Sequence, residues 1–415
     1  MNPMRDIVSQ NNAGYCLACG KCSAVCPITR WETREYCSPR LLVEKAVNAK
    51  TDAVFNDPLF WSCLTCNRCS QLCPSTVYFS DFIRDSRVLA RQAGLSGDCS
   101  HGDVIQTWAK MMANPDLELN RLDWRDGDVK ISNDSDTLYF VGCLPYYHTL
   151  FKNLNIEGVE IARAAVKLLN HLGIEPQVLA DERCCGHDQI WEGDLETFQT
   201  LAGLNLERIN RSGARRIVTT CPECARTLRL DYPKLVGDHG LEILHLTQLL
   251  YRHASALELT IRNVNSPPRA TYQDACRLSR HLGIYDEPRE LIKAAGFELI
   301  EMERTRHSSL CCGTSGWTAC GSVSKNIQVD RLREARTTGA HLLVTTCVKC
   351  QIHFRCAQAG TENSDTVDIQ VRDLTTLLAD RLPTSSEARN QEILLKANNE
   401  KDVQGQKSET RSDTN

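Results

Sequence analysis

Apolar residues in the middle of the chain alternate between short runs and helical spacing. The runs Thr137–Cys143 and Arg216–Thr220 are rich in β-branched and aromatic residues, which predicts strands. Between them, Ile156–Leu172 and Leu195–Arg211 carry apolar residues at intervals of three and four, which predicts amphipathic helices. Strands that alternate with helices in this way are typical of α/β units with parallel strands.

The same pattern recurs further along the chain. Arg269–Ala275 and His341–Thr346 are predicted strands, and Glu290–Ala295 and Ile327–Arg336 are predicted helices. In both halves the last strand belongs to a shared segment that reads Gly-Ala, two further residues, one aliphatic residue and then Val-Thr-Thr-Cys. Such a repeat indicates two copies of one supersecondary unit. We therefore expect two α/β domains with short parallel sheets, at residues 137–262 and 268–382.

The N-terminal region is predicted to be helical. Pro39–Val47 has proline at an early helical position, and the segment from Phe79 to Met112 is amphipathic. Residues 114–136 are polar and rich in turn residues, which predicts a linker. Residues 383–415 have almost no large apolar side chains and are expected to form a disordered polar tail. The expected fold class is α+β and multidomain, with an α-helical domain at residues 1–125 before the two α/β domains.

Composition narrows the classes of function. Nucleic-acid-binding proteins usually carry a basic domain. The net charge of −4 and the pI near 6.3 give no indication of such a domain in this chain. The first residues are polar and contain no signal-peptide pattern, and no apolar run approaches a membrane-spanning length. We therefore expect a cytoplasmic location, where thiols stay reduced. The 22 cysteines are then expected to be metal ligands more often than disulfides.

Two motifs near the N-terminus share the spacing Cys-x-x-Cys-x-x-Cys-x-x-x-Cys-Pro, which is the bacterial ferredoxin run. In such a run three cysteines bind one cubane [4Fe–4S] cluster, and the fourth binds the other cluster. The expected ligands are Cys16, Cys19, Cys22 and Cys73 for the first cluster, and Cys63, Cys66, Cys69 and Cys26 for the second. Zinc also binds pairs of cysteines. A zinc site gives no reason, however, for a third cysteine at the same interval of three residues or for the proline after the last cysteine.

Each α/β repeat carries a second kind of cysteine pattern. The members are Cys143, Cys184, Cys185, Cys221 and Cys224 in the first repeat, and Cys276, Cys311, Cys312, Cys347 and Cys350 in the second. The last pair follows a predicted strand, at the edge where open α/β sheets place their sites. Five thiolates exceed the needs of a cubane or a zinc ion and suit a larger, less symmetric cluster. A redox disulfide between the adjacent cysteines is the alternative.

These motifs together resemble the D subunit of heterodisulfide reductase over residues 15–382. The resemblance implies that each complete Cys-Cys-Gly (CCG) motif holds a non-cubane [4Fe–4S] cluster through its five cysteines. It also implies that a substrate disulfide is cleaved between the two clusters, which makes all ten cysteines part of the catalytic site. The chain then looks like a fusion of the C and B subunits of that family.

Other candidate residues carry weaker signals. Cys37, Cys99, Cys320 and Cys356 lie outside every motif and are interpreted as incidental or buried thiols. His187 follows the first CCG motif and could protonate a leaving thiolate, although a partly exposed polar residue beside a loop is the favoured interpretation. Lys21 and Lys349 could raise the potential of a nearby cluster, or they could be solvated surface charges.

Two functions remain open. The leading hypothesis is a disulfide reductase subunit that passes electrons through two cubanes to the CCG sites. The alternative is a non-catalytic electron-transfer subunit of a dehydrogenase or respiratory complex. The run Gly313–Gly316 lacks the spacing of a dinucleotide-binding turn, so the electron donor is expected to be a flavoprotein, a hydrogenase or a membrane cytochrome b. Any membrane association is expected to be peripheral, on the cytoplasmic face and through such a partner.

Overall fold

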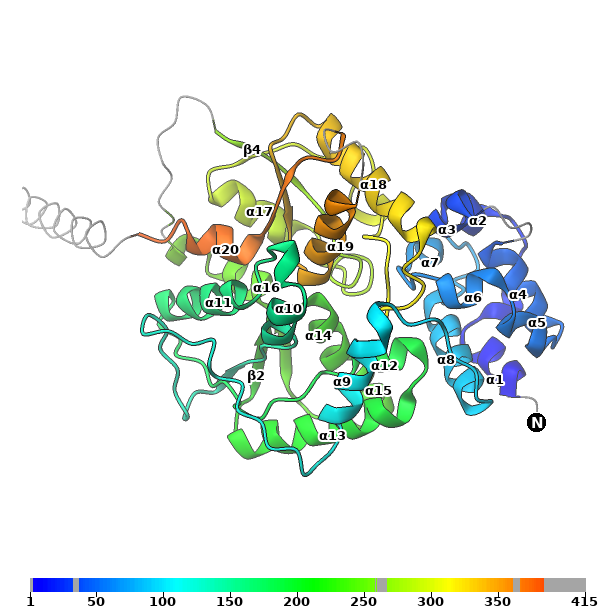
Figure 1. The fold of residues 1–415 in the computed structure, drawn as a ribbon, viewed down its shortest axis with the longest axis horizontal. Coiled ribbons are helices and arrows are strands. Elements are labelled where there is room, and N and C mark those ends of the chain that lie inside the picture. Colours follow the sequence, from blue (N-terminus) through cyan, green and yellow to red (C-terminus); the bar gives the residue numbers. More distant parts are fainter. Residues whose placement is uncertain (1–2, 33–36, 258, 260–266, 361–365, 384–415) are drawn as a thin grey trace, which may run out of the picture.

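The structure is a computed structural model of the 415-residue chain, and it describes residues 3–32, 37–257, 259, 267–360 and 366–383 (Figure 1). The predicted tail at residues 383–415 lies outside the described residues, apart from residue 383. No helix in these described ranges is both long enough and apolar enough to cross a membrane.

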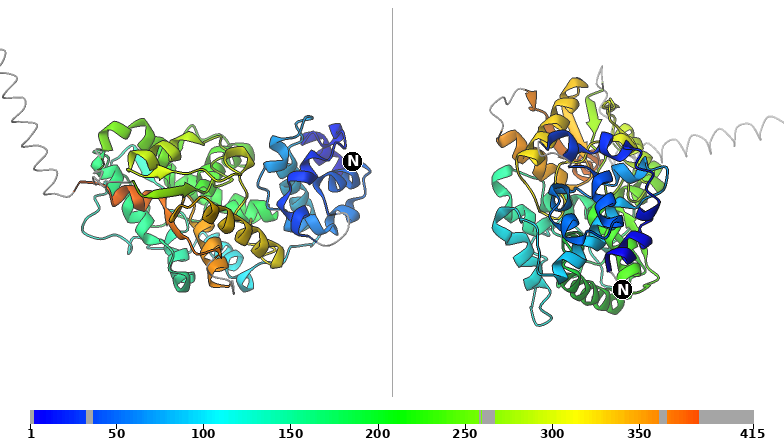
Figure 2. Two further views of the ribbon diagram at one scale, coloured as in Figure 1. Left: turned by 90° about the horizontal axis from the view of Figure 1, so that it is seen from above. Right: turned by 90° about the vertical axis from the view of Figure 1, so that its right-hand side faces the viewer.

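Helices build the N-terminal part, and Figure 2 shows those drawn in blue gathered at one end of the molecule. They are α1 (Pro3–Gln10), α2 (Lys21–Val25), α3 (Pro27–Trp31), α4 (Pro39–Val47), α5 (Thr51–Phe55), α6 (Pro58–Ser62), α7 (Arg68–Gln71) and α8 (Phe79–Gln92). Helix α9 (Val104–Met112) lies apart from them and packs against the helices at His187–Glu192 and Leu195–Ser212 of the first repeat. The predicted helix at Pro39–Val47 is confirmed, and Ser38 caps its N-terminus by accepting from the Leu41 amide. The predicted helical stretch from Phe79 onward is two helices, because the chain turns at Gly94 with a positive φ.

The first α/β repeat contains a three-stranded parallel sheet in the order β1-β2-β3. Its elements are β1 (Thr137–Tyr139), α10 (Leu144–Leu150), α11 (Val159–His171), α12 (His187–Glu192), α13 (Leu195–Ser212), β2 (Arg216–Thr219), α14 (Pro222–Arg226), α15 (Tyr232–Leu235), β3 (Glu242–His245) and α16 (Leu246–Arg252). Leu138 pairs with Ile217, which pairs with Ile243, so one apolar row crosses the sheet.

The second repeat contains a four-stranded parallel sheet in the order β5-β4-β6-β7. Its elements are β4 (Arg269–Tyr272), α17 (Asp286–Ala294), β5 (Glu298–Leu299), α18 (Ser322–Thr337), β6 (Leu342–Thr345), α19 (Val348–Ala359), β7 (Gln370–Asp373) and α20 (Leu374–Ala379). The expected architecture of helices followed by two α/β regions with short parallel sheets is confirmed. Strands β3, β5 and β7 were not predicted from the sequence.

A matched pair of hydrogen bonds shows that the two sheets are built alike. The Tyr139 hydroxyl lies 3.1 Å from the Thr220 hydroxyl, and the Tyr272 hydroxyl lies 3.1 Å from the Thr346 hydroxyl. Each threonine directly precedes the first cysteine of the Cys-x-x-Cys pair that follows the central strand. The same bond therefore fixes the start of the last cysteine pair in both repeats.

The N-terminal helices contact both repeats. Helix α3 packs against α18 of the second repeat, and α8 packs against α12 of the first. On α8 the buried guanidinium of Arg87 donates to the carbonyls of Phe60 and Cys63, at 2.7 and 3.0 Å, and to the carbonyl of Trp191, at 2.8 Å. One side chain thus joins the second ferredoxin motif to the first repeat.

The close approach of α8 to the first repeat depends on Gly193. Gly193 has a φ of 92°, and a Cβ there would collide with the Arg87 carbonyl and lie 2.8 Å from the Val88 nitrogen. We expect Gly193→Ala to lower the free energy of unfolding by about 3 kcal/mol, from left-handed strain and overpacking together. Chemical denaturation measures this change.

Gly203 on α13 provides the matched control, because a Cβ there meets nothing within 4 Å. Gly203→Ala is expected to stabilise the protein by at most about 1 kcal/mol through helix propensity. Equal effects of the two substitutions would contradict the described contact between α8 and the first repeat.

Candidate functional site

Four cysteines line one cavity in the N-terminal part. Cys63, Cys66 and Cys69 of the second ferredoxin motif face it, together with Cys26 from the first motif. The structure therefore brings together the four residues expected to bind the second cubane. Burial raises the pKa of the Cys63 thiol to about 12, so its thiolate is stable only beside a cation such as iron.

The first ferredoxin motif is nearer the surface. Cys19 is exposed, while Cys16 and Cys22 are half-buried. The Tyr78 amide donates to the Asn11 carbonyl at 3.1 Å, and the Asn12 side chain donates to the Thr76 carbonyl at 3.3 Å. These bonds hold the segment that follows the second motif next to the segment that precedes the first motif. This arrangement is compatible with Cys73 as the fourth ligand of the first cluster, which stays a prediction.

The first CCG set gathers at the carboxyl edge of its sheet. The Cys143 and Cys184 sulfurs lie 3.8 Å apart, and the Cys224 and Cys185 sulfurs lie 3.4 Å apart. Hydrogen bonds from Cys143 and Cys185 hold the pKa of Cys184 well below its usual range. The fifth member, Cys221, ends the loop after β2 and is half-buried.

The second set repeats this arrangement at the edge of its own sheet. Hydrogen bonds from Cys311 and Cys350 lower the pKa of Cys312 to about 5. The Cys312 sulfur also lies 3.3 Å from Nδ1 of His353, on α19. All ten cysteines of the two sets are free thiols in the structure. Each repeat therefore holds one thiol of lowered pKa within its adjacent cysteine pair.

The two sets face each other across a buried group of charges. Lys349, from the Cys-x-x-Cys pair of the second repeat, lies 2.8 Å from Glu223, which belongs to the same pair of the first repeat. The Lys349 ammonium also lies 2.5 Å from the carboxylate of Asp188. Its side chain is 4% exposed, so the interpretation of Lys349 as a solvated surface charge is wrong. The salt bridges instead join the two repeats beside their cysteines.

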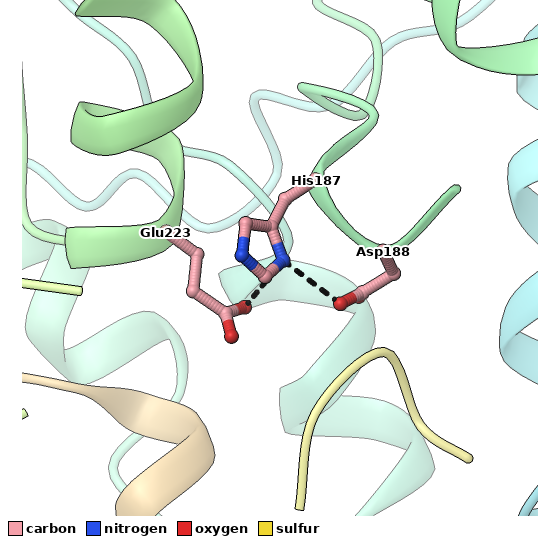
Figure 3. A group of neighbouring side chains, drawn as sticks. All are labelled: His187, Asp188 and Glu223. Carbon is pink, nitrogen blue, oxygen red and sulfur yellow. Dashed lines mark hydrogen bonds and ion pairs between the residues drawn. The ribbon is translucent and has the colours of Figure 1, made fainter. Parts of the chain in front are cut away.

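His187 belongs to the same buried group (Figure 3). Its Nδ1 lies 3.0 Å from Asp188 and 3.4 Å from Glu223, and its Nε2 accepts from the Arg277 guanidinium at 2.9 Å. Burial lowers the pKa of His187 to about 3, so the imidazole is neutral. His187 is only 2% exposed, so the interpretation as a partly exposed residue is wrong. Both ring nitrogens are already paired.

Figure 3 shows that His187, Asp188 and Glu223 converge, and their ligand atoms lie within 4.8 Å of one another. Such a trio could hold a divalent cation. The Lys349 ammonium already contacts both carboxylates and supplies the positive charge that a metal ion would supply. The charges of the three side chains are therefore already compensated by Lys349 without a metal ion.

Two arginines join the second ferredoxin motif to the second CCG set. Arg280 donates to the carbonyl of Cys66 at 2.6 Å and to the carbonyl of Ser309 at 2.8 Å. Arg277 donates to the carbonyl and the hydroxyl of Thr65, at 2.6 and 2.7 Å. Arg277 follows Cys276 directly, and Thr65 precedes Cys66. The loop around the expected second cubane is thereby fixed against the second CCG set.

Three buried polar atoms beside the cysteines have no hydrogen-bond partner among the described residues. They are Nη2 of Arg280, Nε2 of Gln189 and Nε2 of His353. The first two are donors, and Gln189 lies beside Cys184. Inorganic sulfides are acceptors that would satisfy such donors. The residues present therefore fit iron–sulfur clusters at the cysteine sets.

The remaining cysteines and Lys21 lie elsewhere. Cys37 is buried, and Cys99, Cys320 and Cys356 are half-buried. Cys356 accepts from the Lys325 ammonium at 2.9 Å. Lys21 is exposed on α2.

Four charged residues of the site were not predicted from the sequence, namely Arg277, Arg280, Asp188 and Glu223. One signal could have found Glu223, because it occupies the same place in its Cys-x-x-Cys pair as Lys349 does in the other repeat.

Models of protein families match most of the cysteine-bearing chain. A "Cysteine-rich domain" (CCG) model matches residues 137–229 and 270–355. A "4Fe-4S dicluster domain" model matches residues 12–77. The matches cover the two ferredoxin motifs and all ten cysteines of the CCG sets.

Several curated proteins are similar to this chain. The D subunit of the dihydromethanophenazine:CoB–CoM heterodisulfide reductase is 30% identical in Methanosarcina barkeri, over 64% of each chain, and 30% identical in Methanosarcina acetivorans, over 66% of each. The alignments thus span about two thirds of these relatives. The EtfAB:quinone oxidoreductase of Syntrophomonas wolfei is 32% identical over 51% of this chain and 30% of its own.

Solved structures add little. An aspartate racemase homologue from Pyrococcus horikoshii aligns with 59% of this chain and 96% of its own, at a TM-score of 0.24 and 11% identity. A likeness of this size supports no argument about fold or function.

Gly142 lets the backbone pass close to the first CCG set. It has a φ of 66°, and a Cβ there would lie 3.0 Å from the Cys224 sulfur. We expect Gly142→Ala to cost about 1–2 kcal/mol of stability from left-handed strain. By displacing Cys224 it should also remove about four irons per chain. Iron analysis of anaerobically purified protein measures the loss.

Gly173→Ala is the control for this substitution. Gly173 has a φ of 75°, but a Cβ there meets nothing within 4 Å. The two variants therefore share the backbone strain and differ in contact with a cysteine. If Gly173→Ala lost as much iron as Gly142→Ala, instability rather than the cysteine set would explain the loss.

Proposed function

Because the chain belongs to the family of CCG-domain iron–sulfur oxidoreductases that resemble the D subunit of heterodisulfide reductase, we propose that it reduces a disulfide between its two CCG sets. The electrons would come from a partner and pass through the two ferredoxin motifs. One observation carries this proposal. The second CCG set is joined to Cys66 through Arg280 and faces the first set across Lys349.

The exposure of the two ferredoxin motifs supports a direction for this route. Cys19 is exposed, and the side chains next to the first motif include Tyr15 and Leu17, which are 71% and 70% exposed. Exposed apolar side chains beside a redox site suit a transient contact with another redox protein. The cysteines of the second motif lie deeper and beside the second CCG set. Electrons would enter at the first motif and leave the second motif toward Cys311 and Cys312.

The chain's own residues prepare the CCG sets for this chemistry. Reduction of a disulfide consumes two electrons and two protons, and clusters at the two sets would each supply single electrons. The protein holds the sets face to face, buries seven of their ten cysteines and keeps a cationic group, Lys349, between them. His187 is neutral, with both ring nitrogens paired, so we assign it an orienting role, and the two protons that the product thiols take up come from solvent water.

A second function is favoured by one observation. The region between the two sets already contains the ion pairs of Lys349 with Asp188 and Glu223. A substrate would have to fit beside this network. In the alternative, the chain relays electrons without binding a disulfide, as a subunit of a larger redox complex. The similarity to the EtfAB:quinone oxidoreductase supports this alternative.

Spectroscopy on protein kept without oxygen separates these functions. Four clusters correspond to about sixteen irons per chain, and two cubanes alone to about eight. We expect about sixteen, and we expect a thiol or disulfide added to the oxidised protein to change an EPR signal of a CCG site. A full complement of iron with no response to thiols would support the relay instead.

Substitution of Cys312 tests its proposed role as a ligand of the cluster that reduces the disulfide. We expect Cys312→Ala to abolish the thiol-responsive signal and to lower disulfide reductase activity at least about 100-fold, because a ligand of the reacting cluster is lost. Cys356→Ala is the matched control, because Cys356 lies in the same repeat outside the motif and bonds Lys325. Full activity in Cys312→Ala would overturn the catalytic proposal.

A further inference from the structure

The second CCG set has a histidine ring against one of its sulfurs. Nδ1 of His353, on α19, lies 3.3 Å from the Cys312 sulfur. We propose that His353 donates a hydrogen bond from Nδ1 to this sulfur and thereby raises the reduction potential of the cluster at the second CCG set. The inference rests on the proposed function, since it requires a cluster at this set.

The chemistry of the Cys312 sulfur sets the direction of this hydrogen bond. A cysteine that binds iron does so as a thiolate, which carries no proton and therefore only accepts hydrogen bonds. The proton of the bond then lies on Nδ1 of His353. Both partners are buried, because His353 is 3% exposed and Cys312 is 6% exposed. A hydrogen bond to a charged acceptor is stronger in such surroundings than in water.

A donor at a ligand sulfur changes the reduction potential in one direction. An electron added to a cluster increases the negative charge on its sulfurs, so a donor stabilises the reduced cluster more than the oxidised cluster. Loss of the donor therefore lowers the potential. Because the contact of His353 is with Cys312 itself, the effect belongs to the second site. His353 is in this sense a positioning residue, since it acts through a ligand of the cluster.

Trp317 holds the His353 ring in place. The two rings meet edge to face, with their centroids 5.3 Å apart. Trp317 is buried and has a φ of 56°, which is a strained backbone conformation for a bulky residue. The amide and the hydroxyl of Ser100 both donate to its carbonyl, at 2.7 and 2.8 Å, and its indole N–H donates to the Tyr147 hydroxyl at 3.2 Å. Strain that the surroundings maintain in this way is typical of functional sites.

The first repeat has another residue at the place of His353. His353 is the third residue after Cys350, and the third residue after Cys224 is Thr227. The fold that the repeats share thus does not require a histidine here. The second set is also the one joined through Arg280 to the second ferredoxin motif, from which electrons arrive in the proposed route. A raised potential at this set favours their arrival.

Substitution of His353 tests the inference. His353→Phe keeps a ring of similar size and removes the donor. EPR-monitored redox titration of the intact protein, purified without oxygen, should show the potential of the second site shifted down and that of the first site unchanged. Cys350→Ala identifies the signal of the second site by abolishing it. His353→Asn, whose amide N–H takes the place of the Nδ1 proton, should keep the potential closer to that of the unaltered protein.

Electron–nuclear double resonance gives a second measurement that does not depend on activity. In the unaltered protein, a proton that exchanges with ²H₂O should couple to the second site. The same coupling should be absent from His353→Phe, because the proton belongs to the imidazole.

His101→Asn is the control. The His101 ring also packs against Trp317, with centroids 5.4 Å apart, but its Nδ1 contacts the Ser100 hydroxyl. Asparagine tolerates the φ of 59° at this position. This substitution should change neither potential. An equal shift in His101→Asn and His353→Phe would overturn the inference, because a general disturbance of the aromatic group would then explain both.

Two further outcomes separate the inference from the proposed function. An unchanged potential and an unchanged proton coupling in His353→Phe, with all iron retained, would overturn the inference and leave the proposed function standing. About eight irons per chain in the unaltered protein would overturn both. If His353→Phe loses iron from the second site, protein labelled with ¹⁵N-histidine decides, because the absence of a ¹⁵N coupling at that site overturns the inference.

Discussion

A buried thiolate is stable only where a cation or hydrogen-bond donors compensate its charge, and this constraint governs the arrangement of the motif cysteines. Burial raises the pKa of Cys63 to about 12, and the pKa values of Cys26 and Cys69 are shifted upward for the same reason. Iron bound to these sulfurs would remove the cost that burial imposes. The same requirement explains why Arg280, with an unpaired donor, lies between two cysteine sets.

The α/β repeats meet this constraint through their shared topology. Parallel strands put the cysteines of each repeat at the carboxyl edge of its sheet, beside the Tyr139–Thr220 and Tyr272–Thr346 bonds. The two edges face each other, and the Lys349 salt bridges join them. The second ferredoxin motif is held against both repeats. Arg280 of the second repeat donates to the Cys66 carbonyl, and Arg87 donates both to the Cys63 carbonyl and to the Trp191 carbonyl of the first repeat.

Local patterns in the sequence predicted the repeat, the main helices and the parallel strands, because apolar spacing and cysteine spacing are local properties. The grouping of Cys26 with Cys63, Cys66 and Cys69 also followed from spacing. Strands β3, β5 and β7 were missed, because β5 has two residues and β3 and β7 have polar residues at both ends, which leaves one or two apolar positions to recognise. The roles of Arg277 and Arg280 depend on contacts more than 200 residues apart in sequence, which spacing cannot indicate. The burial of His187 likewise depends on the second repeat.

Mössbauer spectroscopy of the protein grown on ⁵⁷Fe and kept without oxygen shows whether the cysteines of the two repeats bind iron. We expect two kinds of iron in about equal amounts, one from cubane clusters at the ferredoxin motifs and one from the less symmetric sites of the CCG sets. A spectrum that contains cubane iron alone would contradict this expectation, because the ten cysteines of the two repeats would then hold no iron.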